Sequence, residues 1–314
     1  MKNNRGVYIL AVLYATIIGL SFLFTKIALR FADPIDVLAY RFIASFVMIS
    51  TIMRVRKITL VYNKEELKRL IILALFHPLA YFTFQTFGLK YASSSEAAII
   101  QAASPIFILI LATISLGEET NIYQKLFTLL SVFGVVYVIG MTSLSFESAS
   151  IKGIILQICS ALCFSVYNVM MRSLTKDFSS EKICYIISAG GFVGFGITAI
   201  IKNLIYNSTG NFLALSMNLN FILAIIYLGA IASATASLIN GYVLYRIEAY
   251  KMSVFTNLRT IVSVLAGVLL LKEKIFHYHI IGSALIIFGV IGTNFLDNNG
   301  IERLKVSLRE YRSP

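Results

Sequence analysis

The residues with the clearest capacity for chemistry are polar side chains set within long apolar runs. Arg259 lies near the middle of one such run, two positions after Asn257. Its guanidinium can bind a carboxylate or a phosphate through two parallel hydrogen bonds. Because a charge in an apolar environment is costly, we predict that Arg259 and Asn257 contact a substrate. The alternative is a structural arginine that is bonded to backbone carbonyls or to Glu248.

A second set of polar residues recurs at intervals of four. His77, Tyr81 and Gln85 therefore share one face of a helix, and Pro78 removes a backbone hydrogen bond beside them. Imidazole titrates near neutral pH, so His77 is the candidate for carrying a proton. A neutral histidine that is hydrogen-bonded to a neighbouring helix is the alternative, and we favour it. Tyr81 and Gln85 are candidate substrate contacts.

Other apolar runs carry bulky amides, phenols and a lysine that could also reach a ligand. Small hydroxyl residues at such spacing more often pack helices together, so we select the larger side chains. Lys26 is as well explained by a long side chain reaching the membrane surface, and for Arg41 we favour that explanation. The remaining candidate substrate contacts are Tyr14, Lys26, Gln101, Tyr167, Asn168 and Asn240.

The elements that must position these residues are membrane-spanning helices. The chain is 58% hydrophobic and 13% charged, with a mean hydropathy of +0.82, whereas soluble domains carry about 25% charged residues. A span needs ~20 apolar residues. The sequence therefore predicts an all-α polytopic membrane protein without a large extramembrane catalytic domain. Its ten expected spans are 7–29, 36–53, 70–89, 96–116, 123–142, 153–172, 182–201, 220–244, 252–271 and 278–296.

The distribution of basic residues predicts the orientation. With the N-terminus inside, most of the 27 Lys and Arg residues fall on the inner side. Both termini are therefore expected in the cytoplasm, with the chain in a plasma membrane of the bacterial inner-membrane type. This asymmetry also explains the net charge of +12 without a nucleic-acid partner. The three cysteines are interpreted as packing residues, and we expect no metal and no cofactor.

The chain repeats itself at an offset of 155 positions. Leu116 and Glu118 align with Leu271 and Glu273, and the run Phe133-Gly134-Val135 aligns with Phe288-Gly289-Val290. We therefore divide the chain into 1–146 and 147–300, followed by a basic cytoplasmic tail, 301–314. Because each copy has an odd number of spans, the second enters the membrane upside down. Inverted repeats are typical of alternating-access transporters, although duplication for bundle stability alone is the alternative.

These motifs resemble the drug/metabolite transporter superfamily, and within it the ten-span EamA type. The resemblance rests on Leu116-x-Glu118, on Tyr123 and on the Phe133 run, preceded by Ala103-Ser104-Pro105, and on Gly19-x-Ser21-Phe22 and Ala39-x-Arg41-Phe42. It implies a transporter, usually an exporter of small organic metabolites. It also implies a central cavity lined by spans 1, 3, 4, 6, 8 and 9, with spans 5 and 10 at the periphery.

Several functions remain compatible with the sequence. We expect an exporter of an amino acid or a related anionic or zwitterionic solute, and the alternative is a multidrug-type exporter of amphipathic or cationic compounds. An intramembrane lipid-modifying enzyme or a channel is less favoured, because no nucleophile motif and no filter sequence is visible. We expect no enzyme activity. The partners are then a small-molecule substrate and the lipid bilayer, with the chain acting as a monomer or a homodimer. Coupling would use His77 or a carboxylate at the end of a span, and facilitated transport without coupling is the alternative.

Overall fold

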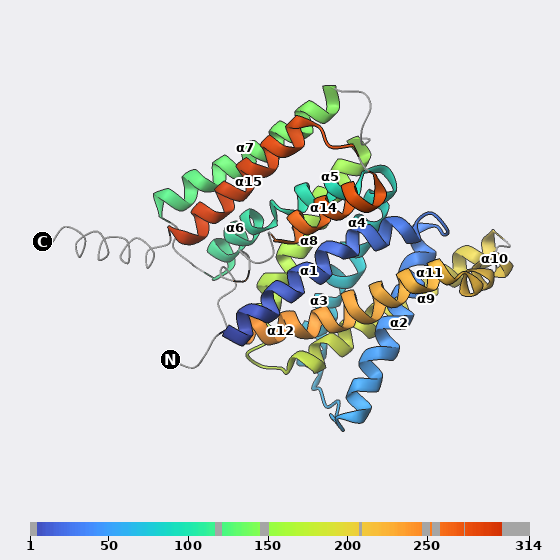
Figure 1. The fold of residues 1–314 in the computed structure, drawn as a ribbon. Coiled ribbons are helices and arrows are strands. Elements are labelled where there is room, and N and C mark those ends of the chain that lie inside the picture. The colour runs from blue at the N-terminus through green and yellow to red at the C-terminus, as the bar shows by residue number, and fades with distance from the viewer. Residues whose placement is uncertain are drawn as a thin grey trace, which may run out of the picture.

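The computed structural model describes residues 5–116, 121–144, 151–206, 209–246, 252, 258–272 and 274–296, and helices are the only regular secondary structure in them (Figure 1). Four sets of predicted features lie outside the described residues. They are Asn257, the Glu118 and Glu273 pair, Glu248, and the basic tail 301–314. The predicted boundary at residue 146 also falls in an undescribed stretch.

The first half of the chain provides the five expected spans, two of which are interrupted. The spans at 70–89 and 96–116 are each divided, the first by a π-helical turn and the second by two non-helical residues. The elements are α1 (Arg5–Ala28), α2 (Pro34–Val55), α3 (Lys64–Ala74), η1 (Leu75–Ala80), α4 (Tyr81–Tyr91), α5 (Ser94–Gln101), α6 (Ser104–Leu116) and α7 (Ile122–Leu144).

The second half repeats this plan with a different interruption. The span expected at 220–244 is continuous but contains a long π-helical stretch, and a short helix precedes it in the polar connection. The elements are α8 (Ile151–Leu174), α9 (Ser180–Ile205), α10 (Thr209–Ala214), η2 (Leu215–Met217), α11 (Leu219–Ile226), η3 (Tyr227–Thr235), α12 (Ala236–Arg246), α14 (Leu258–Leu271) and α15 (His277–Phe295).

Local sequence signals explain where several helices begin. The side chains of Asn63 and Ser93 each accept a hydrogen bond from the backbone N–H of the glutamate three positions later. The carboxylate of that glutamate accepts in return from the backbone N–H of Asn63 or Ser93. These reciprocal pairs are capping boxes, which satisfy two exposed donors at a helix start. Pro78 has no N–H to donate, and His77 before it has non-helical dihedral angles of −143° and 110°. The proline therefore marks the kink at η1.

The two copies of the repeat meet where equivalent residues touch. Ser131 of α7 donates to the carbonyl of Ile286 on α15 across 3.1 Å, and these positions are separated by the repeat offset of 155. A methyl group on Gly289 would lie 2.6 Å from the carbonyl oxygen of Phe127. Helices α7 and α15 are thus packed closely along each other, and Figure 1 shows them as a pair at one side of the bundle. This agrees with the peripheral position expected for spans 5 and 10.

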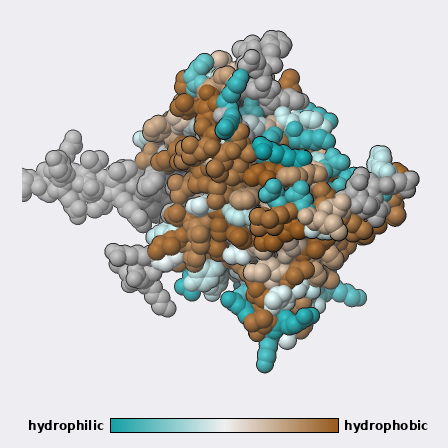
Figure 2. Space-filling view, turned by 45° about the vertical axis from the view of Figure 1, so that its right-hand side comes forward, coloured by the Kyte–Doolittle hydropathy of each residue, from teal (hydrophilic) through white to brown (hydrophobic). Residues whose placement is uncertain are grey.

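The exterior fits a lipid environment. Among the described residues, six helices are long and apolar enough to cross a membrane, and three shorter apolar helices accompany them. Hydrophobic side chains cover the middle of the face shown in Figure 2, and hydrophilic ones gather toward its edges. The chain is thus an all-helical, multi-pass membrane protein.

Close approach between α2 and α9 depends on Gly191. A methyl group at Gly191 would lie 2.3 Å from the Phe42 ring, whereas one at Gly196 on the same helix would meet nothing within 4 Å. We expect Gly191→Ala to lower the free energy of unfolding by about 1–3 kcal/mol through overpacking. The matched Gly196→Ala should raise it by about 0.5–1 kcal/mol, because alanine favours helices over glycine. Thermal unfolding of the purified variants measures both, and equal shifts would contradict this packing.

Candidate functional site

Both halves of the chain contribute to a small central cavity. Its walls come from α1, α2, η1, α4, α8, η3 and α12. The cavity volume is about 20 Å³, which is room for roughly one water molecule. The structure is therefore closed around this centre. The lining residues are Tyr14, Ile18, Ser21, Arg41, His77, Tyr81, Phe82, Phe164, Tyr167, Ala232, Ser237 and Asn240.

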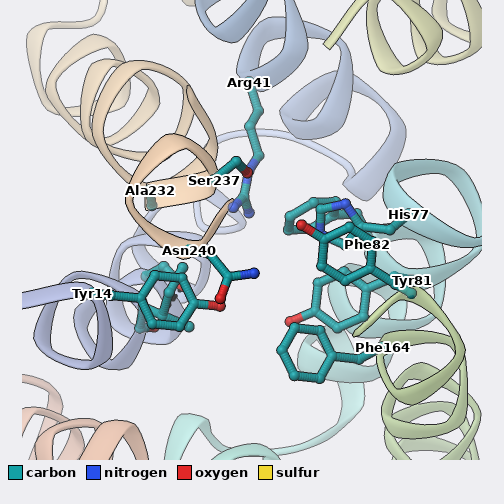
Figure 3. Close-up of a pocket in the computed structure, with 12 residues that line it drawn as sticks. Tyr14, Arg41, His77, Tyr81, Phe82, Phe164, Ala232, Ser237 and Asn240 are labelled. Atoms are coloured by element: carbon teal, nitrogen blue, oxygen red, sulfur yellow. Dashed lines mark hydrogen bonds between the residues drawn. The ribbon is translucent and has the colours of Figure 1, made fainter. Parts of the chain in front are cut away.

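Arg41 points into this cavity instead of reaching for the membrane surface (Figure 3). The side chain is 1% exposed. Its Nε donates to Ser233 Oγ across 2.8 Å, and its Cζ lies 4.0 Å from the centroid of the Phe82 ring. Its Nη1 has no hydrogen-bond partner. A methyl group on Gly229 would come within 2.5 Å of the Arg41 carbonyl oxygen, so this glycine allows η3 to approach α2 and place Ser233 there.

His77 lies in the same cavity, stacked between two tyrosines. The centroid of its ring is 4.1 Å from that of Tyr167 and 5.1 Å from that of Tyr81, with interplanar angles of 20° and 22°. Its Nδ1 is buried and lacks a hydrogen-bond partner. The kink at η1 turns the ring toward α8, so His77 and Tyr81 remain neighbours although the helix between them is irregular.

Asn240 and Tyr14 form the opposite wall. Figure 3 shows both facing the His77, Tyr81 and Phe82 rings across the cavity, with the Arg41 guanidinium entering between the two groups. Asn240 is 1% exposed, and its Oδ1 has no hydrogen-bond partner. Among the described residues, no aspartate or glutamate lines the cavity. The positive charge of Arg41 thus has no counter-charge there.

Arg259 lies behind the cavity wall, at the break between α5 and α6. Its Nη2 donates to the carbonyl of Gln101 across 2.8 Å and to Ser104 Oγ across 3.3 Å. In a continuous helix that carbonyl would accept from the N–H of residue 105, but Pro105 has none. The Cζ of Arg259 is 4.7 Å from the centroid of the Phe164 ring, which lines the cavity. Ser104 Oγ donates to the same carbonyl across 2.6 Å, so Arg259 is a second donor to a carbonyl that the proline deprives of its helical partner. The Nε and Nη1 of Arg259 have no hydrogen-bond partner among the described residues.

The other predicted contacts lie outside the cavity lining. Gln85 donates to the Tyr81 hydroxyl across 3.0 Å, and Gln101 donates to Ser160 across 2.9 Å. Asn168 donates to the carbonyl of Phe164 in its own helix across 2.8 Å. Lys26 donates to the carbonyls of Leu89 and Ala92, at the end of α4. The structure thus brings together Tyr14, His77, Tyr81, Tyr167 and Asn240, and places Gln85, Gln101, Asn168, Arg259 and Lys26 around them.

The lining differs from the expected one in which spans contribute. Arg41 comes from the second span, which was not expected at the cavity, and the described residues of spans 4 and 9 are absent from the lining. The relevant signal was the distance of Arg41 from the start of α2 at Pro34, which is about 10 Å at the rise of a helix. At that depth, an arginine can turn inward as easily as outward.

Ion pairs join the two halves at both ends of α2. At its start, Asp36 accepts from Lys202 Nζ across 2.5 Å and from Asn203 Nδ2 across 3.1 Å. Beyond its other end, Arg56 pairs with Glu181 across 2.9 Å. Ion pairs therefore hold the two halves together at both ends of α2. No group of three His, Cys, Asp or Glu residues in the described ranges could hold a metal ion.

Comparisons with known proteins agree with this architecture. A sequence model described as the EamA-like transporter family matches residues 5–140 and 151–295. An uncharacterized transporter, YcxC, of Bacillus subtilis (strain 168) is 42% identical over 91% of this chain and 92% of its own. A protein of Escherichia coli (strain K12) named "Probable amino-acid metabolite efflux pump" is 22% identical, over 92% and 94%. One crystal structure matches with a TM-score of 0.67 at 15% identity, covering 94% of this chain and 100% of that one.

Proposed function

Since this chain belongs to the EamA-like transporter family, whose model matches both of its halves, we propose that it exports a small organic solute by alternating access. We further propose that this solute is an amino acid or a related zwitterion or anion. The chain is a membrane transporter of the drug/metabolite type and not an enzyme. The outward direction of transport is supported by the name of the Escherichia coli relative, which describes an efflux pump. We place both termini in the cytoplasm on the basis of the Lys and Arg distribution.

Three unpartnered atoms around one cavity carry the proposal on substrate. Arg41 Nη1, His77 Nδ1 and Asn240 Oδ1 are all buried, and they come from three separate helical elements. Buried polar groups are normally hydrogen-bonded, so three such atoms around one small space are the natural contacts for a polar ligand. The guanidinium requires an acceptor, best a carboxylate, and the amide oxygen requires a donor, such as an ammonium group. A zwitterion supplies both.

The closed volume supports alternating access. A cavity of about 20 Å³ is too small for an amino acid, so binding requires the halves to separate on one side. Helices that belong to different halves are joined by ion pairs near each membrane surface. Opening the cavity toward one membrane surface would break the ion pairs near that surface and keep those near the opposite surface. The complete proposed cavity lies within one chain, so a monomer contains all of it.

Three matched ligands test the substrate class. L-Leucine, 3-methylbutylamine and 4-methylpentanoate share an aliphatic group and differ in carrying both charges, only the ammonium, or only the carboxylate. We expect leucine at 100 times its Kd to raise the Tm of the purified protein by about 5 °C. The carboxylate should bind more weakly and the amine least, because the cavity carries an unpaired positive charge. Binding of the amine but not of leucine would instead establish the cationic class of substrate.

A further inference from the structure

A carboxylate and an imidazole meet inside the membrane region, away from the central cavity. Glu96 Oε1 on α5 lies 3.8 Å from His279 Nε2 on α15, and the two side chains are 5% and 4% exposed. The pair joins the first half of the chain to the second. Each residue lies in the first turn of its helix, so the pair is at the end of the bundle where α5 and α15 begin.

The remaining atoms of both residues are already engaged. Glu96 Oε2 accepts from the backbone N–H of Ser93 across 2.9 Å, which closes the capping box of α5. His279 Nδ1 accepts from the backbone N–H of Phe276 across 3.4 Å. An imidazole whose Nδ1 accepts carries its hydrogen on Nε2 when it is neutral. The free carboxylate oxygen therefore faces the N–H of a neutral imidazole.

We propose that the Glu96–His279 pair is the site that binds the proton whose entry drives export; this inference rests on the proposed function. The pair alternates between a carboxylate with a neutral imidazole and a carboxylate with an imidazolium, taking one proton from the outer side and releasing it to the inner side. The imidazolium carries a hydrogen on Nδ1, so it can no longer accept from the Phe276 N–H. The contact at the start of α15 is then lost, while the contact to Glu96 strengthens.

Helix α5 connects this pair to the centre of the protein. It runs from Ser94 to Gln101, and Gln101 binds Arg259 and Ser160 at the break beside the cavity. Along its length, Thr260 and Ser263 of α14 donate to the carbonyls of Ala98 and Ser94, each across 3.3 Å. A shift of α5 against α15 would therefore move the segment that holds the cavity wall.

The described residues of the helices packed against α5 and α15 contain no second carboxylate; these helices are α1, α4, α7, α8 and α14, together with α15 itself. The titratable residues of α7 are Tyr123, Lys125 and Tyr137. His279 also lines a largely apolar cavity of about 310 Å³ between α5, α14 and α15. The other charged or titratable groups on those helices include Lys26, Tyr91, Lys152, Arg259, His277 and Tyr278. A substitution of Glu96 therefore removes the only carboxylate among the described residues of α5 and these helices.

His77 is a weaker candidate for the coupling proton. It shares its cavity with Arg41, and no carboxylate among the lining residues could balance a second positive charge. Bringing like charges together in a low-dielectric site is unfavourable. The Glu96–His279 pair offers the compensation that the cavity lacks.

Proteoliposomes loaded with leucine separate coupling from transport. Exchange of labelled leucine at equal pH measures transport alone, and uptake into vesicles at internal pH 6 and external pH 8 measures coupling. With one proton exchanged per leucine, that gradient supports accumulation of up to about 100-fold. Glu96→Gln should reduce the ratio of gradient-driven uptake to exchange to near one, and His279→Gln should do the same from the other helix. Glutamine also fits a capping box, so Glu96→Gln preserves the start of α5.

Ser93→Ala is the matched control, because it weakens the same cap but keeps the carboxylate. It should lower the Tm and retain the gradient-driven accumulation. Exchange without stimulation by the gradient in the unmodified protein, or stimulation retained in both Glu96→Gln and His279→Gln, would overturn the proton site and leave the transporter function standing. Absence of leucine exchange in the unmodified protein would instead count against the proposed function.

Discussion

Replacing Arg41 with glutamine is expected to weaken leucine binding by about 10- to 150-fold, the equivalent of one charged hydrogen-bonded contact of about 1.5–3 kcal/mol. The expectation follows from the unpartnered Nη1, which faces a cavity without a described carboxylate. Since a bound carboxylate is the only anion in the proposed complex, leucine should lose more affinity than an analogue that keeps the ammonium group but lacks the carboxylate. Isothermal titration of leucine and of leucinamide, which lacks the carboxylate, measures the difference.

The stability of the same variant distinguishes ligand binding from structure. Arg41→Gln removes a buried charge without a counter-charge, which is favourable, and also the bond to Ser233 and the contact with Phe82, which is unfavourable. These effects oppose each other, so we expect only a small change in the Tm of the ligand-free protein. Arg41→Lys keeps the charge but loses the planar fork and the bond to Ser233, and should weaken leucine binding by a smaller factor. If Arg41→Gln unfolded the protein and left the affinity of the folded fraction intact, Arg41 would be a structural residue.

Spacing alone predicted the membrane helices and the repeat, because both appear in the sequence as residue types that recur over fixed lengths or at a fixed offset. Apolar runs of helical length predicted spans that the described helices confirm. The offset of 155 identified Ser131 and Ile286 as equivalent, and these residues touch. Such features depend on helix length and on symmetry, which a sequence displays directly.

The roles of the two arginines could not be separated in this way. Arg41 and Arg259 both lie in apolar runs, and their types alone give each the same chemistry. The difference arises from their partners across the bundle: Arg41 donates to a hydroxyl and lines the cavity, whereas Arg259 donates to a backbone carbonyl and a hydroxyl outside the lining. That carbonyl lacks its helical donor because Pro105, in the other half of the chain, has no backbone N–H. Tertiary contacts of this kind are not encoded in local spacing.

Arg259→Gln is expected to lower the free energy of unfolding by roughly 2–4 kcal/mol, because the Gln101 carbonyl loses its charged donor and the Phe164 ring loses its cation. The loss should be visible as a fall in Tm before any ligand is added. Leucine affinity of the remaining folded protein should fall less than in Arg41→Gln. A variant with normal Tm and abolished leucine binding would instead make Arg259 the anion-binding residue.

The broken helix supplies a rescue that is specific to this explanation. Pro105→Ala restores a backbone N–H at the position from which a continuous helix would donate to the Gln101 carbonyl. In the Arg259→Gln background, Pro105→Ala should therefore recover part of the lost stability, about 1 kcal/mol for one hydrogen bond. In the unmodified protein, the same change has no free carbonyl to satisfy and should gain less. Thermal unfolding of the four proteins gives this coupling energy, and additive effects would show that Arg259 stabilises the fold by a route other than the proline break.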